Sequence, residues 1–164
     1  MAITEKLRNM AEEVGIRLER VGGIPVWEAQ PVYRHQTVIF RIQTSIRRTE
    51  GGSNQCGCVH VSDVCIRFPD GSQKRPDIAI FCREPDEQDE EITLLPEAVI
   101  EILSKGYEAK DLQIGVPFYL AQGIRDVIVF DPYTLKVLHF RQKETREMTS
   151  PVEIALECGC LCTV

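Results

Sequence analysis

RPDIAIFC at residues 75–82 and EAVIEILSKG at residues 97–106 are the two stretches that decide the fold. Each contains a short apolar run with the length and composition of a buried β-strand. Each also carries a carboxylate within or directly beside that run, Asp77 in the first and Glu101 in the second. An ionised carboxylate in a buried strand is costly unless another charge compensates it. We therefore interpret Asp77 and Glu101 as candidate ligands of a cation.

Strand geometry gives a way for the two carboxylates to meet. Alternate residues of a strand point to the same side, so Asp77 shares a face with Ala79, and Glu101 shares one with Val99. If the two strands are neighbours, both carboxylates converge on one point at the edge of the sheet. Such a point suits Mg²⁺ or Mn²⁺, which prefer oxygen ligands and leave coordination positions for water and phosphate. The chemistry indicated is metal-assisted hydrolysis of a phosphodiester.

The rest of the chain predicts one mixed α/β sheet packed against helices, in a single domain over residues 1–164. Apolar periodicity and turn residues predict helices and strands in alternation. The predicted helices are 2–14, 35–48 and 110–122, and the predicted strands are 16–21, 24–29, 58–68, 76–82, 98–104, 126–131, 135–141 and 152–162. Pro117 either kinks the third helix or marks its true first turn near Gly115.

Composition sets the outer limits on function. The chain has 164 residues, of which 43% are hydrophobic and 27% charged, with a net charge of −6. That balance is typical of an ordinary globular protein and argues against one that coats nucleic acid by positive charge alone. No apolar stretch approaches the length of a membrane span, and the charged start MAITEKLRNMAEE lacks the features of a secretory signal. We therefore expect a cytoplasmic protein.

The chain contains seven cysteines, at positions 56, 58, 65, 82, 158, 160 and 162. The odd number and the absence of an export signal predict reduced thiols rather than a disulfide framework. Alternate spacing predicts that Cys158, Cys160 and Cys162 are small apolar fillers on one face of a strand. A cysteine-ligated zinc scaffold is the alternative, although zinc ligands are usually separated by two to four residues.

Several short strings occur in an order that resembles a known family. They are RPDIAI, the apolar VIEILS, then AKDL, FYLAQGI and VIVFDP, preceded by LERVGGIPVWEAQP and RHQTVIFRI. This order resembles the Uma-type nucleases, a restriction-endonuclease-like (PD-(D/E)XK) family also classed as a domain of unknown function. The resemblance extends from about Leu18 to Arg141. It implies a restriction-endonuclease-like core and an endonuclease that uses Mg²⁺ or Mn²⁺ to hydrolyse DNA.

The resemblance also implies roles for individual residues. The metal carboxylates fall on Asp77 and Glu101, and the carbonyl of Ile102 is a possible third ligand. Glu19 matches an acidic position in the first hairpin that can approach the same centre. His35 matches the histidine that opens the second helix. Homodimerisation is expected by analogy, because cutting a duplex needs one active site for each strand.

One departure concerns the lysine of the family pattern. The general nuclease pattern places a lysine two residues after the glutamate, where this chain has Leu103. The Uma-type pattern places it on the following helix, where this chain has Gly115. The positive charge must therefore come from Lys110 or Lys105, or be absent. We prefer Lys110 because it begins the predicted helix beside Asp111.

Alternative interpretations accompany these assignments. Glu101 could form a structural ion pair with an arginine, and Glu19 could pair across strands with Arg17 or Arg20. His35 could be a packed neutral histidine, because a helix N-terminus disfavours the charged imidazolium. The missing lysine also allows a catalytically degenerate nuclease fold that acts as a nucleic-acid-binding or protein-interaction module.

Overall fold

The computed structural model describes residues 3–28, 30–51, 55–108 and 110–164. The helices are α1 (Ile3–Glu13), α2 (Tyr33–Ser45), the π-helix η1 (Lys110–Gly115) and α3 (Val116–Ala121). The strands are β1 (Arg17–Val21), β2 (Ile24–Glu28), β3 (Arg47–Arg48), β4 (Val59–Val61), β5 (Ile66–Arg67), β6 (Gln73–Lys74), β7 (Ile78–Phe81), β8 (Ala98–Ile102), β9 (Asp126–Phe130), β10 (Lys136–Arg141), β11 (Glu144–Thr149), β12 (Glu153–Ala155) and β13 (Cys160–Thr163).

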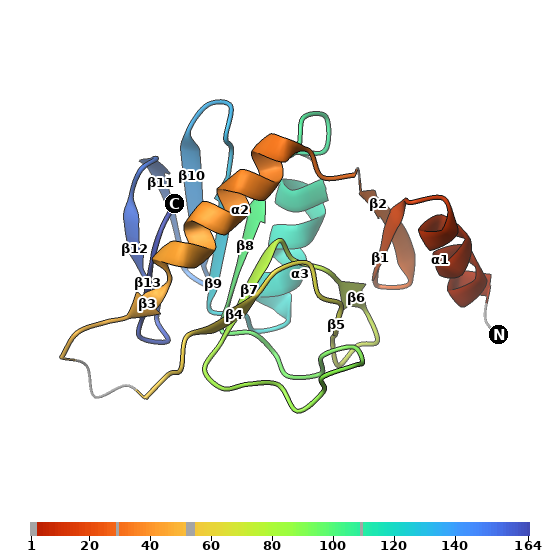
Figure 1. Cartoon of the computed structure of the whole chain (residues 1–164), viewed down its shortest axis with the longest axis horizontal. Coiled ribbons are helices and arrows are strands. Elements are labelled where there is room, and N and C mark those ends of the chain that lie inside the picture. The colour runs from red at the N-terminus through yellow and green to blue at the C-terminus, as the bar shows by residue number, and fades with distance from the viewer. Residues whose placement is uncertain (1–2, 29, 52–54, 109) are drawn as a thin grey trace.

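A six-stranded sheet of order β11-β10-β9-β8-β7-β4 forms the centre of the molecule. Its strands pair antiparallel except for β8 and β9, which are parallel. A parallel pair needs a crossover connection, and η1 and α3 supply it. Helix α2 lies across the sheet, and β12, β13 and β3 form a small sheet beside its C-terminal end (Figure 1). These observations confirm the predicted mixed α/β class.

The two faces of the central sheet build separate cores. Ile78, Ile100 and Ile128 pack on the side of α2 and the small sheet. The intervening residues, which include Ala79 and Val99, pack with α3. Because side chains alternate along a strand, Asp77 and Glu101 belong to the α3 side. Glu101 accordingly contacts Tyr119 of α3, whereas the face-sharing of Asp77 with Ala79 stays a prediction.

The N-terminal part forms a second sheet of order β2-β1-β6-β5. In Figure 1, α1 and the β1–β2 hairpin project from one side of the molecule, away from the C-terminus. The hairpin forms around Gly22 and Gly23, both of which have positive φ angles of 55° and 82°. Glycine adopts such angles without steric cost, so the sequence specifies this turn directly. The hairpin carries Glu19 and Glu28 toward the central sheet.

Three predicted elements have different boundaries. The second helix ends at Ser45, and Arg47–Arg48 instead pair with Leu161 and Cys160 of β13. The stretch 58–68 divides into β4 and β5, which join different sheets. The stretch 152–162 turns back on itself as β12 and β13. In each case a long-range pairing partner overrides the local pattern.

The third helix begins as η1 and continues as α3, with Pro117 in the first turn of α3. Proline is tolerated there because its missing N–H would have no partner in that turn. Residue 29, at the predicted end of the second strand, lies outside the described residues. No described helix is both long enough and apolar enough to cross a membrane.

The expectation of a fully reduced set of cysteines is wrong for this structure. Cys56 is bonded to Cys82, and Cys58 is bonded to Cys160, across sequence separations of 26 and 102 residues. The physical reason is topological, because the segment before β4 runs beside the end of β7 and beside β13. Local spacing carries no information about contacts between such distant segments.

Candidate functional site

Asp77 and Glu101 lie directly opposite each other on neighbouring strands. Strands β7 and β8 pair antiparallel with Ile78 opposite Ile100, which places the preceding Asp77 beside Glu101. The backbone N–H of Asp77 donates to Glu101 Oε2 at 3.2 Å, and the N–H of Ile102 donates to Asp77 Oδ2 at 2.7 Å. The two residues are only 3% and 1% exposed. The predicted meeting of the two carboxylates is therefore present in the fold.

Glu101 is held from the helix side by Tyr119. The Tyr119 hydroxyl donates to Glu101 Oε1 at 2.7 Å, and the whole Tyr119 residue is buried. Burial raises the pKa of Glu101 well above its usual value, and the negative charges of Asp111 and Asp77 raise it further. The positive charges of Lys110 and Lys74 only partly oppose this. Positive charge brought to the site, such as a bound cation, would therefore lower the pKa of Glu101.

Two buried lysines border the carboxylates. Lys74 Nζ donates to Glu19 Oε2 at 2.8 Å, and Glu19 Oε1 also accepts the backbone N–H of Arg75. Lys110 Nζ donates to Glu28 Oε1 at 2.8 Å and lies 3.8 Å from Glu19 Oε2. Glu19 therefore bridges the two ammonium groups. Their charges lower its pKa despite its burial.

Glu19 does not form the alternative cross-strand ion pair. Arg17 pairs with Asp63, and Arg20 donates to the carbonyl of Gly71. Glu19 is 1% exposed and points to the lysines instead. Likewise, Glu101 has a tyrosine and a backbone N–H as its hydrogen-bond donors, not an arginine.

Asp111 adds another carboxylate to the same region. Its Oδ1 lies 3.4 Å from Lys110 Nζ. Burial raises the pKa of Asp111 to about 7, with Lys110 opposing the rise and Asp77 adding to it. Near neutral pH this group is therefore poised between its protonated and ionised forms.

His35 reaches the site from the first turn of α2. Its Nε2 lies 3.2 Å from Asp77 Oδ2. Burial lowers the pKa of His35, but its hydrogen bond to Asp77 and the charges of Asp77 and Glu28 outweigh burial, so the net shift is upward. The helix-dipole argument for a neutral histidine is therefore overridden, because a carboxylate in direct contact exerts the larger effect.

The cluster contains more acidic than basic groups. Its carboxyl groups are Glu19, Glu28, Asp77, Glu101 and Asp111, and its ammonium groups are Lys74 and Lys110. Among the described residues, Glu28 Oε2 is a buried oxygen with no hydrogen-bond partner. A surplus of buried carboxylate oxygens suits a hard divalent cation. The residues present therefore fit Mg²⁺ or Mn²⁺.

Lys74 lies close to Gly115, the position at which the Uma-type pattern has its lysine. A side chain added at Gly115 would place its Cβ 3.7 Å from Lys74 Nζ and 3.8 Å from the Tyr119 ring. The Lys74 ammonium also lies 5.1 Å from the centre of that ring. The ammonium of Lys74, which belongs to β6, thus lies beside position 115.

Sequence reasoning missed Lys74, Glu28, Asp111 and Tyr119 as members of this cluster. Asp111 had a usable signal, because it belongs to the AKDL string and follows Lys110 directly. Lys74 lies on a two-residue strand that the local pattern does not reveal. Its place depends on the pairing of β6 with β1, which only the tertiary structure establishes.

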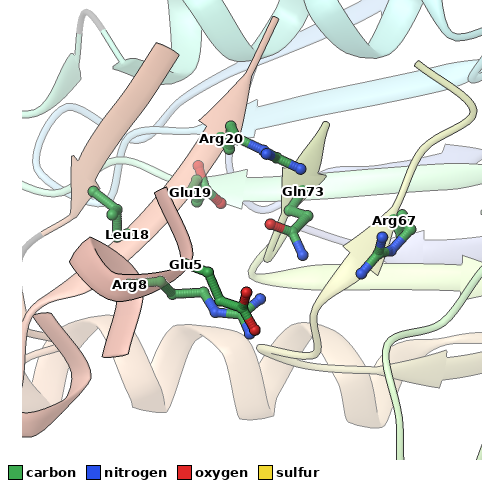
Figure 2. A pocket seen from close by; sticks show the side chains of 7 residues that line it. All are labelled: Glu5, Arg8, Leu18, Glu19, Arg20, Arg67 and Gln73. Carbon is green, nitrogen blue, oxygen red and sulfur yellow. The ribbon is translucent and has the colours of Figure 1, made fainter. Parts of the chain in front are cut away.

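Lys105 lies apart from the buried lysines. It is exposed and lines a pocket of about 120 Å³ that also includes His35, Arg34 and Ser104. A larger pocket of about 230 Å³ lies on the other side of Glu19, and Figure 2 shows the side chains that line it. Its Arg8 and Arg67 are both paired with Glu91. The pocket of about 120 Å³, here named the His35 pocket, is therefore lined by a residue that contacts Asp77.

The predicted site residues fall into two groups. Asp77, Glu101, Glu19, His35 and Lys110 come together, and Lys105 lies at the rim of the adjoining pocket. Ile102 contributes its backbone N–H to Asp77. Whether its carbonyl binds a metal stays a prediction, as do the catalytic roles of the other residues.

The sequence matches the model of the Uma2 family, described as "Putative restriction endonuclease", over residues 4–158. The fold is similar to the crystal structure of a protein from Anabaena variabilis ATCC 29413, titled a putative nuclease belonging to DUF820. That match has a TM-score of 0.59 and 22% sequence identity, and it covers 84% of this chain and 80% of the other. No curated protein matches the sequence. The structural match establishes the nuclease fold, and the family match supports a nuclease-like function.

Proposed function

The chain belongs to the Uma2 family, and from that premise we propose that it is a metal-dependent endonuclease that hydrolyses DNA phosphodiester bonds. The observation that carries the proposal is the pairing of Asp77 with Glu101 across β7 and β8. A protein that needed only stability would gain more from apolar residues at these buried positions. Two adjacent buried carboxylates are better explained as ligands of Mg²⁺ or Mn²⁺.

Each residue of the carboxylate cluster would have its own role in the reaction. Asp77, Glu101 and the Ile102 carbonyl would hold the cation, which supplies an activated water and stabilises charge on the phosphate. Lys110 would orient that water or offset the charge that grows on the reacting phosphate. Glu19 keeps Lys110 and Lys74 charged and close together, since it lies within 4 Å of both ammonium groups. Tyr119 fixes the orientation of Glu101.

The His35 pocket gives a phosphodiester a route to this centre. Arg34 and Lys105 line the pocket and are both exposed, so they can contact phosphate oxygens from solvent. His35 lies at the inner wall and contacts Asp77. A backbone phosphate seated there would approach the carboxylates without having to displace the Glu19–Lys74 ion pair.

The alternative is a degenerate nuclease fold that only binds nucleic acid or protein. It was motivated by Leu103 and Gly115, which stand at the two expected lysine positions. Lys74 and Lys110 weaken that argument, because both place ammonium groups within the carboxylate cluster. We therefore favour the active enzyme.

Homodimerisation is part of the same proposal. Cutting both strands of a duplex requires two active sites, and cyclic dimers are the commonest way to supply them. Strand β11 lies at an edge of the central sheet and is mostly exposed, so it is available for pairing with a second copy. Light scattering of the purified protein measures this directly.

A cleavage assay tests the proposed activity. Supercoiled plasmid and single-stranded DNA are incubated with the protein and Mg²⁺, Mn²⁺ or EDTA, and nicked and linear products are quantified. We expect metal-dependent cleavage, with a loss of roughly 10³-fold in Asp77→Asn and in Glu101→Gln, because each removes a charged ligand. Calorimetric titration with Mn²⁺ should show weakened binding in both variants.

Glu97→Gln is the matched control. Glu97 precedes the same strand as Glu101, but its carboxylate pairs with Arg125 at 3.5 Å. Its cleavage rate should stay within about twofold of the wild type, as is usual for a partly exposed ion pair. Wild-type protein that binds DNA without cutting it would favour the degenerate module. Equal cleavage by the wild type and both site variants would rule out the proposed centre.

A further inference from the structure

Six of the seven cysteines gather on the α2 side of the central sheet. Five belong to the buried core there, and Cys82 packs against them. Four of the six come from two copies of the same tripeptide, Cys-Gly-Cys, at residues 56–58 and 158–160. These tripeptides are about 100 residues apart in sequence and face each other in the fold. The cluster is separate from the carboxylates, which lie on the α3 side.

The sulfur atoms are close enough to share one metal ion. The Sγ atoms of Cys56, Cys158 and Cys160 all lie within 4.8 Å of one another. Cys56 Sγ is 3.6 Å from Cys160 Sγ, and Cys58 Sγ is bonded to Cys160 Sγ. In a tetrahedral zinc site with Zn–S bonds of about 2.3 Å, neighbouring sulfurs are about 3.8 Å apart. The Cys56–Cys160 spacing is close to that value, and reduction of the Cys58–Cys160 disulfide makes Cys58 available as a fourth ligand.

The first tripeptide has a backbone that bends sharply at Cys58. Cys58 has a φ of 49°, a left-handed conformation that is uncommon for any residue but glycine. The bend brings Cys58 Sγ back to within 3.8 Å of the Cys56 carbonyl oxygen. A Cβ at Gly57 would lie 2.8 Å from the carbonyl oxygen of Cys82, so only glycine fits. The usual requirement for two to four residues between zinc ligands is therefore relaxed here by the backbone.

The second tripeptide is fixed by neighbours on both sides. The N–H of Glu157, directly before Cys158, donates to the buried Asp126 at 2.8 Å. The Gly159 carbonyl accepts hydrogen bonds from both the N–H and the hydroxyl of Thr49. A site binds its metal ion more tightly when neighbouring contacts already hold the ligands in position. The second loop is thus held in place by backbone hydrogen bonds, and the first by the fit of Gly57 against Cys82 together with contacts of its sulfurs.

We propose that, in the reduced protein, Cys56, Cys58, Cys158 and Cys160 bind one Zn²⁺ as a structural site. The four thiols lose their protons to solvent as the four Zn–S bonds form, and zinc keeps its +2 state. The disulfides Cys56–Cys82 and Cys58–Cys160 use three of these four sulfurs in the oxidised protein. Thiolates prefer zinc to Mg²⁺ or Mn²⁺, so this site does not compete with the carboxylate centre. The inference is independent of the proposed nuclease activity.

The zinc would join the segment before β4 to β13. That link fixes the small sheet against α2, the helix that carries His35. Such a site contributes to folding directly, because the unfolded chain does not present the four ligands together. Its role is therefore to hold the fold and not to take part in the reaction.

Metal analysis of variant proteins tests the proposal. The full chain is purified under reducing conditions from zinc-supplemented cells, desalted, and analysed for zinc and iron by mass spectrometry. We expect about one zinc per chain in the wild type. The decisive pair is Cys158→Ser and Cys82→Ser, because Cys158 belongs to the metal set and Cys82 to the disulfides. Zinc should fall at least fivefold in Cys158→Ser and stay near the wild-type amount in Cys82→Ser.

Cobalt provides a readout that does not depend on the variants. Reduced, metal-free wild-type protein is titrated with Co²⁺, and tetrahedral thiolate coordination should give intense visible bands that Zn²⁺ then abolishes. Circular dichroism checks that both serine variants are folded. Wild-type protein with no zinc and no cobalt bands, or with iron in place of zinc, would overturn the proposal. So would a zinc content that is lowered by Cys82→Ser and unaffected by Cys158→Ser.

Discussion

The carboxylate cluster and the cysteine cluster lie on opposite faces of one sheet. They differ in how the burial of their side chains affects stability. On the α3 side, Asp77 and Glu101 are buried together with too few positive charges beside them. On the α2 side, buried sulfurs are joined to one another. The first arrangement costs stability unless a cation is added, whereas the second supplies stability.

This difference separates the residues that serve function from those that stabilise the fold. Uncompensated charge in a core is retained only where it serves a purpose beyond packing. Covalently linked or metal-linked sulfurs need no such purpose, because they constrain the unfolded chain. Changes on the α3 side should therefore alter activity first, and changes on the α2 side should alter stability first.

Among the variants that compare the two sides of the sheet, Lys110→Met should have the largest effect, which is on the rate of cleavage. Methionine keeps the length of the side chain but removes the ammonium that pairs with Glu28 and Asp111. We expect the rate of plasmid nicking to fall by about 10² to 10³, equivalent to about 3 to 4 kcal/mol of barrier. Lys105→Met is the control, because Lys105 is exposed at the pocket rim, and it should lose only a few-fold. Equal losses in the two folded variants would contradict the assignment of Lys110.

The second largest effect is on stability and comes from a variant of the cysteine cluster on the α2 side. Cys58→Ser breaks the link to Cys160 across a separation of 102 residues. We expect the free energy of unfolding, measured with urea in non-reducing buffer, to fall by about 2 to 4 kcal/mol. Cleavage by the folded fraction should stay within about twofold. Cys65→Ser is the control, because Cys65 lies outside the cluster, and it should cost less. A large loss of activity without a loss of stability would show that the two faces are coupled.

The smallest effect is a gain of stability in Asp111→Asn that depends on pH. The pKa of Asp111 is raised to about 7 in the folded protein, so the stability that its proton provides is present at low pH and lost as pH rises through 7. Asparagine removes that loss. In EDTA, the variant should become more stable than the wild type by about 1 to 3 kcal/mol on going from pH 5 to pH 8.

Thermal or urea unfolding of both proteins at several pH values measures this difference. Added Mn²⁺ should reduce it, because a cation offsets the same repulsion that the proton relieves in the wild type. If the stability difference between the two proteins is the same at pH 5 and pH 8, the pKa of Asp111 is not raised by its surroundings.

Much of the site was accessible from sequence because its key residues interrupt apolar strands. Asp77 and Glu101 were found by the conflict between their charge and their surroundings, and β7 and β8 formed within the predicted ranges. Lys74 and Tyr119 gave no such signal. Lys74 sits on a strand of two residues, and Tyr119 reads as an ordinary apolar position of a helix.

The sequence by itself determined strands β7 to β10, the first hairpin, the nuclease family and the pair of carboxylates, because each depends on local periodicity or on the order of short motifs. Only the tertiary structure decided that Lys74 fills the space beside Gly115, that His35 touches Asp77, and that the two Cys-Gly-Cys tripeptides meet. Each of these contacts joins segments far apart in the chain. Their partners are selected by how sheets and helices pack, and that information is spread over the whole sequence and absent from any one part of it.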